Sequence, residues 1–211
     1  MTATTPPDAY PPAPIPEHPS QEELRRAEPT CRACDLWEPA TQVVPGRGPN
    51  RARVMLVGEQ PGDREDRAGE PFVGPAGRVL DEGLERAGVV REDIYVTNVV
   101  KHFRYKLRGK RRIHQTPDRW QVSACLPWLE AELSIVHPEV LVCLGATAAK
   151  ALLGPSIRVG RDHGQPLDSE LAPKVTLTAH PSSILRLRGD RERAEAMETL
   201  VADLRAVAGW L

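Results

Sequence analysis

Short apolar runs alternate with amphipathic segments along most of the chain. Four runs predict buried strands, at residues 53–57, 94–97, 139–144 and 175–178. Apolar positions at helical spacing predict helices at residues 75–88, 116–136, 145–154 and 190–208, and Ser20 opens a short helix to about Glu28 through a capping box. Strands that alternate with helices favour an α/β fold: a mainly parallel four-stranded sheet covered on both faces.

The first twenty residues have a different composition from the rest. They include Pro6, Pro7, Pro11, Pro12, Pro14, Pro16 and Pro19. Because proline removes backbone donors, we expect residues 1–20 to be a disordered tail and residues 21–211 to form one domain. Hydrophobic residues make up 40% of the chain, which is enough for a core. No apolar run is long enough to span a bilayer.

The net charge of −1 means that binding to a polyanion would need a local basic patch. Residues 101–112 supply one: the segment contains no acidic residue, and Phe103 and Tyr105 stand between its cations. We expect a loop without carboxylate partners that contacts nucleic acid, although a solvated loop is the simpler alternative. Its cations are Lys101, Arg104, Lys106, Arg108, Lys110, Arg111 and Arg112.

Cysteine usage indicates metal or redox chemistry. The first twenty residues have no apolar signal-peptide core, so we expect a cytoplasmic, reducing environment in which Cys31-x-x-Cys34 is not a disulfide. Cys125 and His102 lie beside predicted element ends and could join the pair, whereas Cys143 lies inside a strand and is expected to be a core thiol. The spacings do not separate zinc from a four-iron cluster.

Polar sequence follows each of the four predicted strands. Since the carboxyl ends of parallel strands share one edge of a sheet, we expect three of these segments to form one site. Ordinary turns and a structural histidine are the simpler alternatives. The segments are Gly58-Glu59-Gln60-Pro61-Gly62, Asn98, Gly145-Ala146-Thr147 and His180-Pro181-Ser182-Ser183.

Together with Pro71-Phe-Val-Gly-Pro-Ala-Gly77 and Val96-Thr-Asn-Val-Val-Lys101, these motifs resemble the family-4 uracil-DNA glycosylases. The resemblance implies a three-layer α/β/α sandwich, a four-iron cluster and uracil-containing DNA as substrate, with single strands favoured. The sequence does not reveal the oligomeric state, and a monomer is the default expectation. Gln60 and the inserted Lys110-Arg-Arg-Ile-His114 resemble one branch, UdgX, which bonds covalently to the abasic sugar that it creates.

The resemblance also implies roles for individual residues. His114 would be the nucleophile that attacks C1′, oriented by Glu59, and His180 would stabilise the departing base. Substrate binding would fall to Gly58, Gln60, Phe72 and Asn98, with Phe72 stacking on the uracil ring and Asn98 bonding its edge. The implied cluster ligands are Cys31, Cys34, His102 and Cys125, and the implied DNA contacts are Lys110, Arg111, Arg112, Ser182 and Arg186.

Three other functions remain open at this point. A conventional family-4 glycosylase would use the same pocket but let water capture the sugar. A DNA-binding module stabilised by a bound metal would not need Glu59, Asn98 and His180 to lie close together. A redox iron–sulfur protein is the third, although no second cofactor motif accompanies the cysteines.

Overall fold

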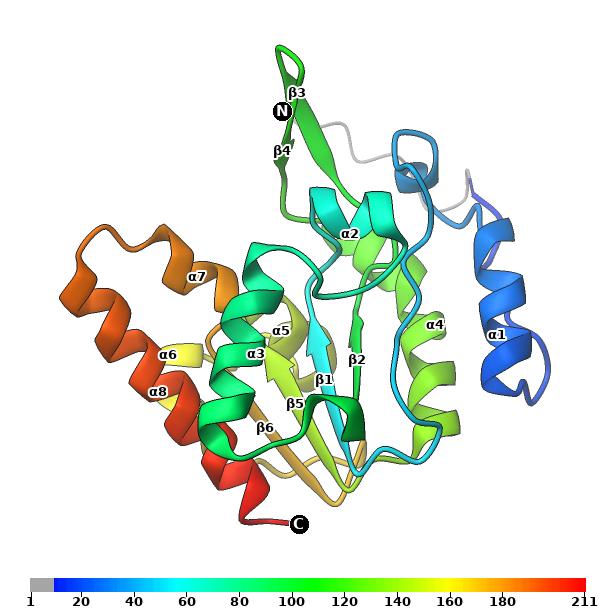
Figure 1. Ribbon diagram of the computed structural model, residues 1–211. Helices are drawn as coiled ribbons and strands as arrows, with labels where there is room; N and C mark the ends of the chain where they lie inside the picture. The colour runs from blue at the N-terminus through cyan, green and yellow to red at the C-terminus, as the bar shows by residue number, and fades with distance from the viewer. Residues whose placement is uncertain (1–9) are drawn as a thin grey trace.

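Four parallel strands form the centre of the protein, for which a computed structural model describes residues 10–211. The strands are β1 (Val54–Gly58), β2 (Ile94–Asn98), β5 (Val140–Leu144) and β6 (Lys174–Thr178). Their order in the sheet is β2-β1-β5-β6 (Figure 1). The predicted strands are therefore confirmed, each within one residue at either end.

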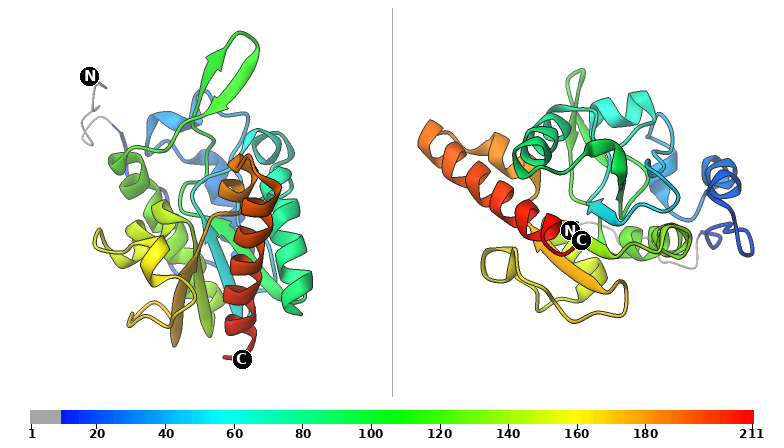
Figure 2. Two further views of the ribbon diagram at one scale, coloured as in Figure 1. Left: turned by 90° about the vertical axis from the view of Figure 1, so that its left-hand side faces the viewer. Right: turned by 60° about the horizontal axis from the view of Figure 1, so that its bottom comes forward.

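Helices cover both faces of this sheet. Met55 and Val57 of β1 pack toward α4 (Arg119–Val136) and α5 (Ala146–Leu153), in the same cluster as the core of α1 (Gln21–Ala27). Val54 and Leu56 point the other way, toward α3 (Pro75–Ala87) and α8 (Asp190–Ala208). Successive side chains of a strand point to opposite faces, so a strand buried on both sides supports two layers of helices. The three-layer sandwich is confirmed (Figure 2).

Several short elements join this frame. The helices α2 (Asp63–Ala68), α6 (Val159–Asp162) and α7 (Pro181–Arg186) were not predicted, nor were the 3₁₀ helices η2 (Glu28–Thr30), η3 (Asp35–Trp37) and η4 (Arg91–Asp93). The basic segment expected to be a loop instead forms an antiparallel hairpin of β3 (Tyr105–Arg108) and β4 (Arg111–His114). It projects beyond the carboxyl edge of the sheet (Figure 1).

The proline-rich segment falls partly outside the described residues, because residues 1–9 are not among them. Residues 10–20 contain no helix or strand. Tyr10 nonetheless stacks on Trp120 at 5.5 Å between ring centroids, and Ala13 and Ile15 pack against the core. This part of the segment lies against the domain, and the boundary at residue 20 stays a prediction. No helix in residues 10–211 is both long and apolar enough to cross a membrane.

Candidate active site

The polar segments after the four strands meet in one pocket of about 760 Å³. The predicted convergence is therefore confirmed, and it extends to the fourth strand end, one more than expected. His114 of the hairpin and Phe72 from the loop before α3 complete the walls. The strand ends contribute Glu59, Gln60, Asn98, Gly145, Thr147, His180 and Ser182.

Gly58 makes room for the two residues expected to bind a base. It lies opposite Asn98 in the β1–β2 register. A Cβ atom at Gly58 would lie 2.4 Å from Oδ1 of Asn98 and 2.7 Å from Cζ of Phe72. Any larger residue would therefore displace one of these side chains. The Phe72 ring stacks at 6.1 Å on that of His180, so an aromatic surface and a buried amide share one side of the pocket.

His180 is held as a neutral imidazole. Its Nδ1 atom accepts a hydrogen bond from the backbone N–H of Ser182 at 3.1 Å, which leaves the ring proton on Nε2. Burial lowers the pKa of His180 to about 4, against the opposing charge of Glu59. At neutral pH this residue is a hydrogen-bond donor rather than a cation.

Glu59 and His114 form the contact that the resemblance implies. His114 Nε2 lies 3.2 Å from Glu59 Oε1, and Thr147 donates to the other carboxylate oxygen. Burial by itself raises the pKa of Glu59, but the hydrogen bonds from His114 and Thr147 outweigh it and keep the pKa below its ordinary value. The carboxylate is therefore ionised and orients the imidazole, whose other ring nitrogen remains unengaged by Glu59.

The Gln60 side chain fixes the hairpin, while Gln60 itself still lines the pocket. Its Nε2 atom donates to the carbonyls of Arg104 and Gln115, and its Oε1 atom accepts from the Arg104 N–H at 2.9 Å. These residues flank the hairpin on either side, so the amide joins the end of β1 to both stems. The side chain is engaged in holding the hairpin rather than free to bond a base.

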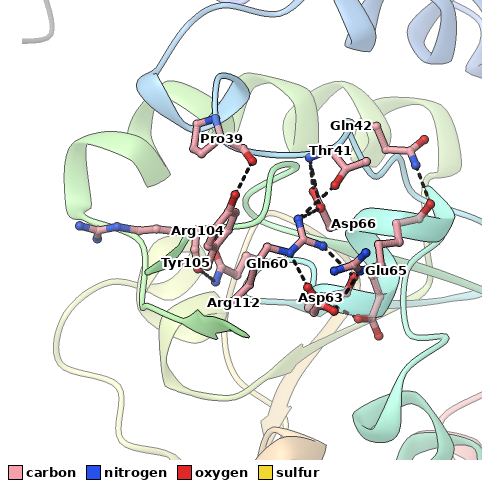
Figure 3. Close-up of polar contacts among 12 residues, drawn as sticks. Pro39, Thr41, Gln42, Gln60, Asp63, Glu65, Asp66, Arg104, Tyr105 and Arg112 are labelled. Atoms are coloured by element: carbon pink, nitrogen blue, oxygen red, sulfur yellow. Dashed lines mark hydrogen bonds and ion pairs between the residues drawn. The ribbon is translucent and has the colours of Figure 1, made fainter. Parts of the chain in front are cut away.

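The role expected of Arg112 is corrected, because it points into the protein rather than toward DNA (Figure 3). Its guanidinium bonds Asp63 and Asp66 of α2, at 2.6 Å to the Asp66 carboxylate, which is fully buried. It also lies 5.0 Å from the centre of the Tyr105 ring, whose hydroxyl donates to the Pro39 carbonyl at 2.8 Å. Arg112 and Tyr105 thus fasten the hairpin to the domain.

The expectation that the basic segment lacks carboxylate partners is wrong for two further cations. Lys101 is buried and pairs with Glu132 at 2.6 Å, and Arg104 pairs with Asp118 at 2.8 Å. Four cations of the hairpin are exposed and form no ion pair within residues 10–211: Lys106, Arg108, Lys110 and Arg111. At the opposite rim Arg186 is exposed and donates to the Ser182 hydroxyl at 3.2 Å.

The residues implied as cluster ligands are all buried beside α4. Burial raises the pKa of Cys125, and the nearby Cys34 and Cys31 raise it further. Two N–H groups point at sulfur: Trp128 Nε1 donates to Cys31 and the Lys101 backbone to Cys125, each at 3.2 Å. Burial lowers the pKa of His102 to about 4, so its imidazole is in the neutral form that binds metals. No disulfide joins these cysteines.

Comparison with known proteins identifies the family of the chain that forms this pocket. The sequence model of the Uracil DNA glycosylase superfamily matches residues 45–205. The chain belongs to that superfamily. It is 39% identical to the type-4 uracil-DNA glycosylase of Thermotoga maritima, over 81% of this chain and 85% of the relative. It is 37% identical to the type-4 uracil-DNA glycosylase of Pyrobaculum aerophilum, over 83% and 91%. A type-5 uracil-DNA glycosylase of the same organism is 28% identical, over 85% and 83%.

Sequence reasoning missed several residues of this superfamily member's pocket. Asp63 lines the pocket and, with the buried Asp66, holds Arg112 of the hairpin from more than forty residues away, which local patterns do not reveal. Thr147 belongs to a predicted segment, but its hydrogen bond to Glu59 was not expected. Glu65 had one available signal, because Gly62-x-x-Glu65 has the spacing of a capping box.

Proposed function

We propose that this protein removes uracil from DNA and that His114 then forms a covalent bond with C1′ of the resulting abasic sugar. The activity toward uracil is supported by the superfamily membership and by type-4 relatives that are 37–39% identical. The observation that carries the covalent step is the imidazole of His114 inside the pocket, 3.2 Å from the carboxylate of Glu59.

Base recognition falls to Phe72 and Asn98. A flipped or single-stranded uracil stacks on the Phe72 ring and matches the donors and acceptors of the Asn98 amide. Cytosine presents a different edge and would leave buried polar atoms unpaired, which costs enough free energy to exclude it. Gly58 allows both side chains to reach the same base.

The bond between C1′ and N1 of uracil breaks with its electron pair moving onto the base. The Nε2–H group of His180 donates to a uracil carbonyl oxygen and stabilises the charge that develops there. The sugar becomes an oxocarbenium-like electrophile. The free ring nitrogen of His114 donates its lone pair to C1′, and the proton on the other ring nitrogen moves toward Glu59. Because the product has no good leaving group, each molecule acts once.

The exposed cations of the hairpin contact the phosphates beside the reacting nucleotide. Along β3 and β4, Lys106, Arg108 and Arg111 share one strand face, while Tyr105 and Arg112 share the face that packs on the domain. Lys110 lies at the turn, and Arg186 with Ser182 lies across the pocket. Each lost phosphate contact should reduce the slope of log Kd against log salt by about 0.7 for single-stranded DNA.

We further propose that Cys31, Cys34, His102 and Cys125 hold a four-iron cluster. The soft sulfur donors, the neutral imidazole and the two N–H···S bonds suit such a group. Within residues 10–211 no three His, Cys, Asp or Glu side chains are placed to hold a single metal ion, so the choice of iron rests on the resemblance to the family-4 enzymes. When bound, it would tie the segment before η3, the loop after β2 and α4 together.

A denaturing gel tests the covalent step. Uracil-containing single-stranded DNA should yield a protein–DNA species that survives boiling in detergent with the wild type but not with His114→Ala. His137→Asn is the matched control, because His137 is exposed at the end of α4, away from the pocket. Adduct formation by His114→Ala would rule out His114 as the nucleophile.

A conventional glycosylase with many turnovers is the second candidate, favoured by the type-4 names of the most similar relatives described above. It predicts free uracil in molar excess over the enzyme and no stable adduct. Measuring both products in one reaction decides between the two functions.

A further inference from the structure

Glu65 connects the two loops that form the base-binding side of the pocket. It lies in α2 and is 7% exposed. One carboxylate oxygen accepts from the N–H of Gly62 at 3.1 Å, and the other accepts from the N–H of Gly74 at 2.8 Å. Gly62 ends the loop that carries Glu59, and Gly74 follows Phe72 by two residues.

The two contacts depend on close approach of the carboxylate to the backbone. A Cβ atom at Gly62 would lie 2.6 Å from Oε2 of Glu65, and one at Gly74 would lie 2.8 Å from Oε1. Two glycines therefore let one side chain reach both loops. Both bonds need acceptors, which a carboxylate supplies at each oxygen and a glutamine supplies at only one.

Phe72 needs such a restraint. Its φ of +57° is in the left-handed region, which bulky residues rarely adopt unless their surroundings enforce it. The next turn packs tightly on it, since a Cβ atom at Gly77 would lie 1.8 Å from the Phe72 carbonyl oxygen. The bond from Gly74 to Glu65 fixes the chain between these two points.

We propose that Glu65 is a positioning residue that holds the Phe72 ring where it stacks on uracil. The proposal rests on the stacking role given to Phe72 above. Both oxygens of this buried carboxylate are engaged by backbone N–H groups. The proposal therefore gives Glu65 a part in binding the base through Phe72 and no part in binding the DNA strand.

The test uses the full-length holoprotein and two affinities. The first is inhibition of the initial rate of uracil release by added free uracil, which reports on stacking. The second is binding of single-stranded DNA that carries a tetrahydrofuran abasic analogue, which has no base. The variants are Glu65→Gln, Phe72→Ala and the double variant. Glu70→Gln is the control, because Glu70 is exposed in the loop that also carries Phe72.

Glu65→Gln should weaken uracil inhibition about tenfold, as expected for a lost hydrogen bond to a charged group, and leave binding of the abasic analogue unchanged. The double variant should match Phe72→Ala alone, because the two residues act through one ring. Glu70→Gln should behave as the wild type. Thermal unfolding of each variant verifies that it is folded at the assay temperature.

Three results would overturn the proposal. If Phe72→Ala weakens uracil inhibition and Glu65→Gln does not, the positioning role is wrong while the stacking role stands. If the two effects add in the double variant, Glu65 acts on something other than Phe72. If Phe72→Ala itself has no effect, the stacking role fails and the positioning role fails with it.

Discussion

Arg112→Ala should separate the two chemical steps of the proposed reaction. The side chain is 11% exposed and pairs with Asp66, whose carboxylate is fully buried. Removing one partner of a buried ion pair costs about 3–5 kcal/mol, because the other charge remains out of water. We take the lower end, about 3 kcal/mol, since the backbone N–H of Thr41 still donates to Asp66.

That loss acts mainly on the hairpin. A two-stranded hairpin is only marginally stable by itself, so its docking on α2 depends on contacts such as this one. A change of about 3 kcal/mol corresponds to a roughly hundredfold lower equilibrium constant for docking, and His114 is in place only in the docked state. Adduct formation should therefore slow by up to about a hundredfold. Uracil release should slow much less, because Phe72, Asn98 and His180 come from other elements.

The assay is a single-turnover reaction with excess enzyme and saturating single-stranded DNA. Adduct on a denaturing gel and free uracil by chromatography are measured in the same samples. Arg111→Ala is the matched control, because it removes the same charge from the neighbouring residue on the opposite, exposed face of the hairpin. If Arg112→Ala forms adduct as fast as Arg111→Ala, the anchoring argument is incorrect.

Three further outcomes are expected. Gly58→Ala should reduce uracil release by at least about tenfold without unfolding the protein, since its Cβ would lie 2.4 Å from Oδ1 of Asn98; uracil release and circular dichroism check this together. The pKa of His180 is lowered to about 4, so its contribution to stability is present above pH 6.5 and is lost as pH falls toward 4. Between pH 7 and pH 5 the free energy of unfolding of the wild type should therefore fall by up to about 2 kcal/mol more than that of His180→Asn. The comparison cancels the contribution of His102, whose pKa is also lowered to about 4, and equal losses in the two proteins would contradict the argument. His102→Ala should lower iron content and visible absorption whereas Cys143→Ala should not; stoichiometric zinc in the wild type would refute the iron assignment.

The strands, the long helices and the meeting of the strand ends could be predicted because they follow from local patterns and from a general property of parallel sheets. Glu59, Asn98 and His180 each stand directly after an apolar run, and parallel strands bring such positions to one edge. The hairpin could not be read in the same way. Its strands are cationic on one face and held by distant acids on the other, so no apolar alternation marks them.

The linear sequence by itself determined the four-stranded sheet, the edge at which its polar residues gather and the motifs of the superfamily, because each depends on neighbours within a few residues. Only the tertiary structure decided which charges are free. Lys101 and Arg112 belong to the same basic run as Lys110 and Arg111, yet the first two pair with the buried carboxylates of Glu132 and Asp66 while the last two are exposed. A charge becomes structural when folding brings an acid to it from a distant segment, and no local pattern contains that information.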